Sequence, residues 1–381
     1  MSPLRLSLHR LRSLLSSFLK REVAYTTLEE VAPPGTIATL LPELEVPTPE
    51  TANMEIEPVN GHLSGPVYTA PRVRTALVSG LRYCPTNHCL LTSGGAVVLE
   101  STGPGARPVP LDTSALRQPT ERIEGIAVPL RCFFNDFYHL LVDNLSRVDL
   151  LNLPHFRSFP NISLLCPNGL TKLEAYFVER LLPSNVTVCP VAPGVLYRPD
   201  RMLVNTFITC RASGYLRGPF IPRLRRHFDI PDTLPSLPKR IFISRRRAAK
   251  GRHVLNEEAL LSRLRPLGFQ AFVLEEMPIE EQIGLFRRAE VVVGAHGAGL
   301  SHLLFAPSTR VLELFATRFV VPHYFLLAKS LGHRYSYLTG SESHQDANFT
   351  VDVKQVEHHV RELLTAASSI GIPSANPNPT F

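Results

Sequence analysis

This chain of 381 residues lacks several features that mark whole classes of protein. No apolar run reaches the ~18–20 residues that a membrane-spanning helix needs. The six cysteines include no pair with Cys-x-x-Cys spacing, which argues against a zinc site. A disulfide between Cys84 and Cys89 would require an oxidising environment. Neither Gly-x-Gly-x-x-Gly nor Gly-x-x-x-x-Gly-Lys-Ser/Thr occurs, so the dinucleotide fingerprint and the P-loop are both excluded. No Asp-x-Asp follows a predicted strand, and we expect neither a metal nor a cofactor.

The net charge of +7 predicts an anionic partner. Nucleic acid, an acidic membrane surface and a phosphorylated small molecule all fit this charge. Residues 1–21 have the pattern of a basic amphipathic helix, which would rest on a membrane or pack on the protein. Arginines interrupt this segment, so it is not a signal peptide, and we interpret the four Asn-x-Ser/Thr sequences as chance. We therefore expect a cytoplasmic protein, with peripheral contact at the inner membrane face through this helix.

The length and composition predict two folded domains, because 381 residues exceed one ordinary hydrophobic core. Residues 22–75 are rich in proline and show little periodicity, so we expect residues 1–75 to comprise the basic helix and an irregular arm. Residues 215–238 contain five prolines and predict a linker. This divides the rest into domains at 76–233 and 234–381. In the first of these, strand, helix and strand patterns over 161–190 indicate a parallel α/β layer.

The second half shows a clearer alternation of strands and helices. Strands are predicted at 240–244, 269–275, 290–293, 310–315 and 333–339. Helices are predicted between them, at 256–268 with Asn256 as the N-cap, at 278–290 and at 321–331. This order predicts a doubly wound parallel sheet.

Unusual residues follow three successive strands of this sheet, where such folds bind ligands. Arg245–Arg247 follow the first strand, Glu275 and Glu276 the second, and the glycine-rich turn "GAHGAG" at 294–299 the third. Glycines permit positive φ angles and close approach of a ligand, and a turn leading into a helix suits a phosphate. His296 can donate a hydrogen bond to a phosphate or sugar oxygen. Each segment alone would be an ordinary loop, but their common edge favours a cleft.

Two further polar positions stand out from apolar surroundings. Glu313 is the one charge in the strand "VLELF", where it would bind ribose hydroxyls or lie on the solvent face of an edge strand. His139 and Asp143 lie four residues apart on a predicted helix, where they would share one face. A histidine with a carboxylate is a candidate general base unit, and a surface polar pair is the alternative.

The ordered motifs now resemble glycosyltransferase family 61, which includes bacterial capsular polysaccharide proteins. The matching pieces are "ISRR", "NEE", "LGF", "EEQI", "AEVVVGAHGAGL" and "VLEL" within residues 240–315. The segment "FYHLLVDNLSR" resembles that family's upstream His-x-x-x-Asp motif, and the resemblance runs over residues 130–340. Two positions depart from the family pattern, because His302 and Asp136 stand where asparagine is common.

The resemblance implies a GT-B fold, in which two Rossmann-like domains face a cleft. It implies sugar transfer from a nucleotide sugar, usually a UDP-sugar, with inversion and without a metal. By motif, His139 and Asp143 fall on the acceptor side of the cleft. The motifs assign the following residues to the donor side: Arg245, Asn256, His296, Gly297, Gly299 and Glu313.

The sequence thus predicts an inverting, metal-independent glycosyltransferase that moves a hexose or pentose to a glycan or lipid-linked glycan of a surface polysaccharide. We favour Asp143 as the base, with the reverse assignment to His139 open. A pyruvyl-type group transferase and a non-catalytic binder of nucleotide sugars or glycans are the alternatives. RNA binding through the basic run at 239–253 ranks last, since aromatic residues are not interleaved there.

Overall fold

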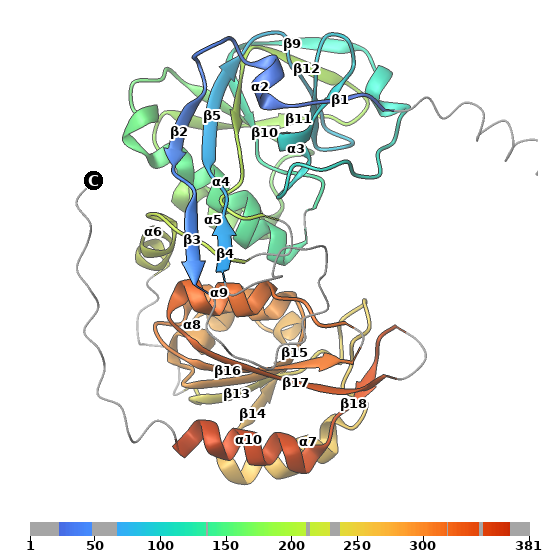
Figure 1. The fold of residues 1–381 in the computed structure, drawn as a ribbon, viewed down its shortest axis with the longest axis vertical. Coiled ribbons are helices and arrows are strands. Elements are labelled where there is room, and N and C mark those ends of the chain that lie inside the picture. The colour runs from blue at the N-terminus through green and yellow to red at the C-terminus, as the bar shows by residue number, and fades with distance from the viewer. Residues whose placement is uncertain are drawn as a thin grey trace, which may run out of the picture.

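The computed structural model describes residues 23–47, 67–134, 136–210, 214–228, 237–317, 319–342 and 346–365. These residues form two lobes, each built on its own β-sheet, with helices between the sheets (Figure 1). The basic helix expected at 1–21 and the boundary expected at 233/234 lie outside the described residues.

The first lobe is built on a ten-stranded mixed sheet. Its central strands β12 (Leu196–Asn205), β9 (Thr120–Pro129), β10 (Ile162–Pro167) and β11 (Val186–Val191) run parallel, which confirms the predicted parallel layer. The other strands pair mainly antiparallel, so this sheet is not the purely parallel one of a Rossmann-like domain. These strands are β1 (Tyr25–Thr26), β2 (Ala38–Leu41), β5 (Val73–Val78), β6 (Arg82–Cys84), β7 (Cys89–Leu91) and β8 (Val97–Val98).

The irregular arm expected within residues 1–75 is partly wrong, because residues 25–47 contain strands of the first lobe. β2 pairs with β5, and β5 itself crosses the expected boundary at 75/76. β3 (Leu44–Pro47) and β4 (Val67–Ala70) form a separate antiparallel pair. This pair reaches the second lobe (Figure 1). Tyr68 of β4 belongs to the same buried hydrophobic cluster as Leu326 of the second lobe.

The second lobe confirms the predicted parallel sheet. β14 (Gln270–Phe272), β13 (Arg240–Ile243), β15 (Val291–Ala295), β16 (Arg310–Ala316) and β17 (Arg334–Glu342) run parallel in that order, and β18 (Phe349–Thr350) adds an antiparallel edge. Helices cover both faces, which explains the unbroken run of apolar residues in β15. Val291 and Val293 face α7 (Glu257–Leu264) and α10 (Val353–Thr365), whereas Val292 faces α8 (Ile279–Arg288) and α9 (His323–Leu331).

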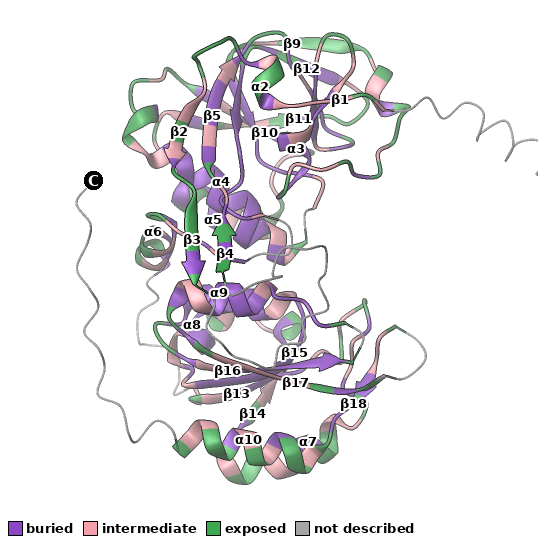
Figure 2. Ribbon diagram, viewed as in Figure 1, coloured by how far each residue is buried: buried purple, intermediate pink, exposed green. Residues whose placement is uncertain are grey.

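The two lobes share one continuous hydrophobic core. Phe177 of the first lobe and Phe305 of the second stack with ring centroids 6.1 Å apart. The predicted linker at 215–238 instead contains helix α6 (Phe220–His227), whose Arg225 donates to the Leu304 carbonyl at 2.9 Å. Buried residues accordingly continue from the first-lobe helices to α9 (Figure 2).

Short helices complete the described part of the chain, and none of its helices is long and apolar enough to cross a membrane. The α-helical ones are α2 (Leu28–Val31), α3 (Leu99–Thr102) and α5 (Lys172–Leu181), and 3₁₀ turns lie at Ala115–Arg117, Leu150–Asn152, Pro154–Phe156, Arg265–Leu267 and Leu274–Glu276.

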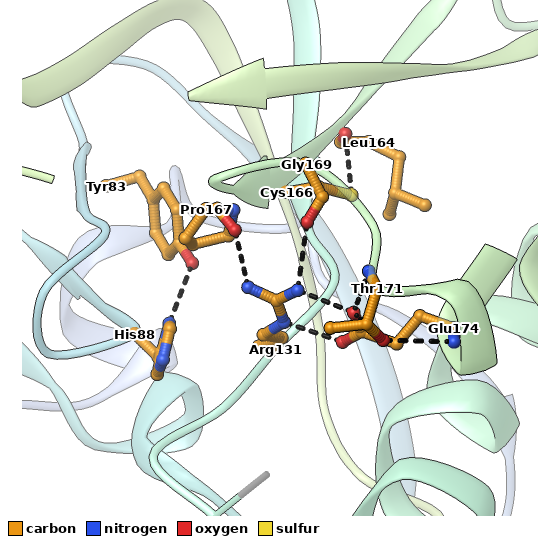
Figure 3. A network of polar contacts seen from close by, with 9 residues as sticks. All are labelled: Tyr83, His88, Arg131, Leu164, Cys166, Pro167, Gly169, Thr171 and Glu174. Carbon is orange, nitrogen blue, oxygen red and sulfur yellow. Dashed lines mark hydrogen bonds and ion pairs between the residues drawn. The ribbon is translucent and has the colours of Figure 1, made fainter. Parts of the chain in front are cut away.

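A buried ion pair holds the carboxyl ends of β9 and β10 against α5 (Figure 3). Arg131, just after β9, donates to both oxygens of Glu174 at 2.6 and 2.7 Å and to the Pro167 carbonyl at 2.6 Å. Glu174 also accepts from the Thr171 backbone in a capping box that begins α5. This network fixes the chain at the point where it turns toward the segment carrying His139.

Candidate active site

His139 and Asp143 lie on a π-helix, His139–Asn144, which continues into α4 (Leu145–Asp149). The wider turn is seen in the Leu145 N–H, which donates to the Leu140 carbonyl five residues earlier. Single π-turns occur often at functional sites. His139 Nδ1 and Asp143 Oδ2 are 2.5 Å apart, so the expected pairing of these two side chains is confirmed.

The geometry reverses the preferred roles of this pair. Asp143 is 1% exposed, and its second oxygen accepts from the Thr209 hydroxyl at 2.5 Å. Both Asp143 oxygens are therefore occupied, whereas the His139 side chain is 22% exposed and stacks on Phe134 with centroids 5.0 Å apart. His139 is thus the group that a substrate can reach, and Asp143 orients it.

The pKa of His139 lies above its usual value. Burial acts to lower this pKa, but the hydrogen bond and the charge of Asp143 outweigh it and favour the imidazolium. Asp136 adds to the increase, and Lys250 of the second lobe opposes it. His139 therefore holds a proton more firmly than a free histidine does.

His296 and Glu313 form a second buried pair, at the carboxyl end of β15. His296 Nδ1 lies 2.6 Å from Glu313 Oε1, and the Tyr335 hydroxyl donates to Glu313 Oε2 at 2.5 Å. Glu313 is 0% exposed, and β16 lies between β15 and β17. Both interpretations of Glu313 from the sequence, a ribose ligand and an edge-strand residue, are therefore wrong, because it positions His296.

Burial removes charge from both members of this pair. It raises the pKa of Glu313 to about 8 and lowers the pKa of His296 well below its usual value. The neighbouring Arg252 and Arg245 lower the pKa of His296 further. At neutral pH these shifts favour an uncharged imidazole at His296 beside a protonated Glu313 carboxyl.

The glycines after β15 provide close packing rather than positive φ angles. Gly297 has an extended backbone with φ 175°, and a Cβ there would overlap the Arg245 guanidinium. A Cβ at Gly299 would lie 2.9 Å from Leu274 Cδ1. Gly297 therefore makes room for Arg245, whereas Gly299 allows the following 3₁₀ helix, Ala298–Phe305, to pack against the Leu274 side chain.

Arg245 and Arg252 are two half-buried cations without a salt-bridge partner in the described chain. Arg245 Nε has no hydrogen-bond partner there, and Arg252 lies 5.3 Å from the centroid of Phe319. Burial and the charge of Arg252 lower the pKa of Arg245 to about 10. By contrast, Arg246 and Arg247 are exposed and both pair with Glu276, so only the first arginine of the triplet turns inward.

Asn256 occupies a structural position. Its side-chain amide donates to the Val351 carbonyl at 2.8 Å, and its oxygen accepts from the Val351 N–H at 3.0 Å. The side chain makes no N-cap hydrogen bond to α7. Asn256 therefore joins α7 to the segment after β18, and the prediction that it contacts the donor is not supported by this placement.

Residues from both lobes meet beside these pairs, and sequence reasoning missed several of them. His323, the first residue of α9, has its ring centroid 6.0 Å from that of His296 and 5.1 Å from that of Tyr138. Arg252 follows the predicted strand by eight residues, inside a basic run, so the sequence showed its charge but not the direction of its side chain. Tyr138 lies inside the quoted segment "FYHLLVDNLSR", but no pattern singled out its side chain, and no periodicity or motif marked His323.

The described residues contain no group of three or more His, Cys, Asp or Glu side chains placed to hold a metal ion. Their titratable pairs and arginines can bind an anion and accept or donate a proton.

Comparison with known proteins supports the predicted family. Residues 137–312 match the model of the family Glycosyltransferase 61. An EGF domain-specific O-linked N-acetylglucosamine transferase of Drosophila melanogaster is 30% identical over 229 residues, which cover 53% of this chain and 42% of that protein. A beta-1,2-xylosyltransferase of Oryza sativa subsp. japonica is 44% identical over 68 residues, which cover 17% of this chain and 13% of that protein. A beta-1,2-xylosyltransferase of Arabidopsis thaliana is 39% identical over 64 residues, which cover 16% of this chain and 12% of that protein.

The chain spans less than half the length of these curated relatives. They come from an insect and two plants, so the expected bacterial capsular type finds no support in them. The predicted enzyme class is confirmed at the level of the matched domain. Residues 137–312 of this chain match the glycosyltransferase 61 domain; they include His139, Asp143 and His296, and Glu313 follows directly after the matched range.

Proposed function

We propose that the protein transfers a sugar from a nucleotide sugar, a UDP-sugar, to a hydroxyl group of a glycan acceptor, with inversion at the anomeric carbon. In this proposal the two lobes act as the halves of a GT-B enzyme. The second lobe binds the donor, and the first lobe supplies the base.

One observation carries this proposal: Arg245 and Arg252 are half-buried guanidinium groups, near enough for the charge of Arg252 to lower the pKa of Arg245, and neither forms an ion pair with a carboxylate among the described residues. Two buried like charges disfavour each other unless an anion compensates them. They lie near the start of the helix Ala298–Phe305, whose first N–H groups have no partner within the helix. A diphosphate would satisfy both the charges and the amides.

His296 supports the same assignment. Its Nε2–H is a donor without charge, held in place through Nδ1 by Glu313. A donor of this kind can bond an oxygen of the leaving diphosphate as negative charge develops there. Arg245 and Arg252 would stabilise the same charge, so that the bond between the anomeric carbon and the phosphate oxygen breaks with its electron pair on the diphosphate.

His139 acts as the base in this proposal. The acceptor hydroxyl attacks the anomeric carbon, its proton passes to the imidazole of His139, and the nucleoside diphosphate leaves from the opposite side. A single displacement of this kind inverts the configuration. Asp143 holds the imidazole through Nδ1 and stabilises the imidazolium that forms.

The transferred sugar, the acceptor and the cellular location are separate parts of the proposal. The relatives are named as an EGF domain-specific O-linked N-acetylglucosamine transferase and as beta-1,2-xylosyltransferases. We propose an N-acetylhexosamine or a pentose as the transferred sugar. A surface-polysaccharide or lipid-linked acceptor, a cytoplasmic location and membrane contact through residues 1–21 stay predictions.

Calorimetry with UDP-, GDP- and CMP-sugars tests the proposal. We expect a UDP-sugar to bind the full chain, and Arg245→Ala to weaken its binding roughly 10- to 150-fold, since hydrogen bonds to charged groups contribute about 1.5–3 kcal/mol. Arg247→Ala is the matched control, because Arg247 lies in the same basic run but is exposed and pairs with Glu276. No binding of any nucleotide sugar, or equal losses in both variants, would overturn the donor assignment.

A further inference from the structure

Two buried polar atoms meet at the junction of the lobes without a hydrogen-bond partner in the described chain. One is the hydroxyl of Tyr138, which directly precedes His139, and the other is Nδ1 of His323 at the start of α9. Tyr138 is 7% exposed. The two rings contact each other edge to face, with centroids 5.1 Å apart and planes at 76°. Buried polar atoms usually have a partner, so two exceptions in one place require an explanation.

Their position lies between the two titratable pairs of the candidate active site. The Tyr138 ring centroid is 5.1 Å from that of His139, and the His323 ring centroid is 6.0 Å from that of His296. Gly214 packs closely against this contact, because a Cβ there would overlap the His323 carbonyl oxygen and lie 3.2 Å from the Tyr138 hydroxyl, so residue 214 supplies no side-chain partner. In the proposed function the transferred sugar lies between the base and the phosphate-binding groups, which is where these two polar atoms are.

The charge of both groups favours a neutral ligand. Burial lowers the pKa of His323 to about 3, with further lowering by His296 and His139. Burial also raises the pKa of Tyr138 well above its usual value. Both side chains are therefore uncharged at any physiological pH. They suit a hydroxyl group, which both donates and accepts, rather than a phosphate or a carboxylate.

We infer that Tyr138 and His323 form a subsite that binds a hydroxyl group of the transferred sugar and helps to select that sugar. The inference rests on the proposed function and extends it. Arg245 and Arg252 bind the charged diphosphate, whereas Tyr138 and His323 bind the neutral, hydroxyl-rich part of the donor. The two lobes each contribute one of the two groups, so the sugar is bound only where they meet.

Calorimetry on Tyr138→Phe and His323→Phe tests the inference, with UDP, UDP-glucose, UDP-N-acetylglucosamine and UDP-xylose as probes. Each substitution keeps a ring and removes the polar atom. We expect the preferred UDP-sugar to bind roughly 2- to 13-fold more weakly, as the loss of one neutral hydrogen bond predicts. The affinity for UDP alone should change less than twofold. Tyr176→Phe and the exposed His155→Gln are controls on the surface of the first lobe.

Thermal unfolding of the same variants separates binding from structure. The Tyr138 hydroxyl has no partner to lose, so Tyr138→Phe should keep or raise the melting temperature while it weakens sugar binding. A structural hydroxyl would instead lower the melting temperature and leave the ratio of UDP-sugar to UDP affinity unchanged, and this result would overturn the inference. Wild-type protein that binds UDP and UDP-sugars equally would also overturn it and leave the diphosphate site standing. Wild-type protein that binds none of the probes would overturn the proposed function itself.

Discussion

The contact between Gly297 and Arg245 makes a sharp prediction for the substitution Gly297→Ala. The backbone at Gly297 is extended, so alanine introduces no backbone strain. Its Cβ would overlap the Arg245 guanidinium, which is the far end of a flexible side chain. We expect the guanidinium to move aside at little cost in stability. The substitution thus removes Arg245 from its position without changing Arg245 itself.

The expected loss of UDP affinity follows from the proposed contact between Arg245 and the diphosphate. A hydrogen bond to a charged group contributes about 1.5–3 kcal/mol, which is roughly a 10- to 150-fold change in an equilibrium constant. The Kd of UDP should rise by that factor in Gly297→Ala. The free energy of unfolding should fall by less than about 1 kcal/mol, because the three atoms nearest to the new methyl group all belong to the flexible Arg245 side chain.

A double-mutant cycle measures whether Arg245 carries the effect. Arg245→Ala alone should weaken UDP binding by a similar factor, and adding Gly297→Ala to it should change little, because the displaced side chain is already gone. Gly94→Ala is the matched control, since its φ is not positive and the nearest atom to a new Cβ, Thr92 Oγ1, lies 3.8 Å away. Calorimetry with UDP on all four variants completes the cycle.

Additive losses in the double variant would refute the reasoning, because Gly297 would then act on the ligand directly and not through Arg245. Unchanged UDP affinity in Gly297→Ala would refute it as well. A large loss of stability would show that Arg245 cannot move aside.

Three further predictions concern the base, the metal and the first lobe. Because the pKa of His139 is raised, kcat should rise with pH at a midpoint above 6.5. Asp143→Asn should move this midpoint to lower pH and reduce kcat by about 10²–10⁴-fold. A kcat that does not change with pH would exclude His139 as the base. EDTA should leave the activity unchanged, and loss of activity that Mn²⁺ restores would contradict the metal-free mechanism. Glu174→Gln breaks the buried pair with Arg131, and denaturant unfolding should show a loss of about 3–5 kcal/mol, against a negligible loss for the exposed pair in Lys239→Gln.

The second lobe could be predicted from the sequence because each of its elements has a strong local signal. Unbroken apolar runs mark β15 and β16, which are buried on both faces. Gly268 ends the predicted helix in a left-handed conformation, as expected of a C-terminal glycine.

The first lobe could not be predicted to the same degree, and β12 shows why. This strand lies between β9 and the antiparallel strands, yet it contains Pro199 and several charged residues. Its register shifts between Pro199 and Arg201, so an irregularity accommodates the proline that would otherwise break the pairing. A bulge of this kind has no signal in the sequence that separates it from a loop.

The candidate site was predictable in its residues but not in their roles. Local spacing placed Asp143 beside His139, and strand ends placed His296 and Arg245 at one edge. The role of Glu313 depends on Tyr335, which reaches it from the neighbouring strand β17. The burial that makes Asp143 an orienting group depends on Thr209, 66 residues away. Contacts of this range arise only from the tertiary fold.

The hydrophobic core that both lobes share limits how this protein can be recombined. Leu303 and Phe305 of the second lobe are buried against first-lobe residues such as Leu140 and Phe177. Separating the halves would bring these side chains into water, and a lone second lobe would present an apolar surface that favours aggregation. Exchange of donor halves between relatives therefore has to carry the matching interface from the first lobe, and a cut placed in the middle of the chain would yield two insoluble fragments rather than a donor-binding unit.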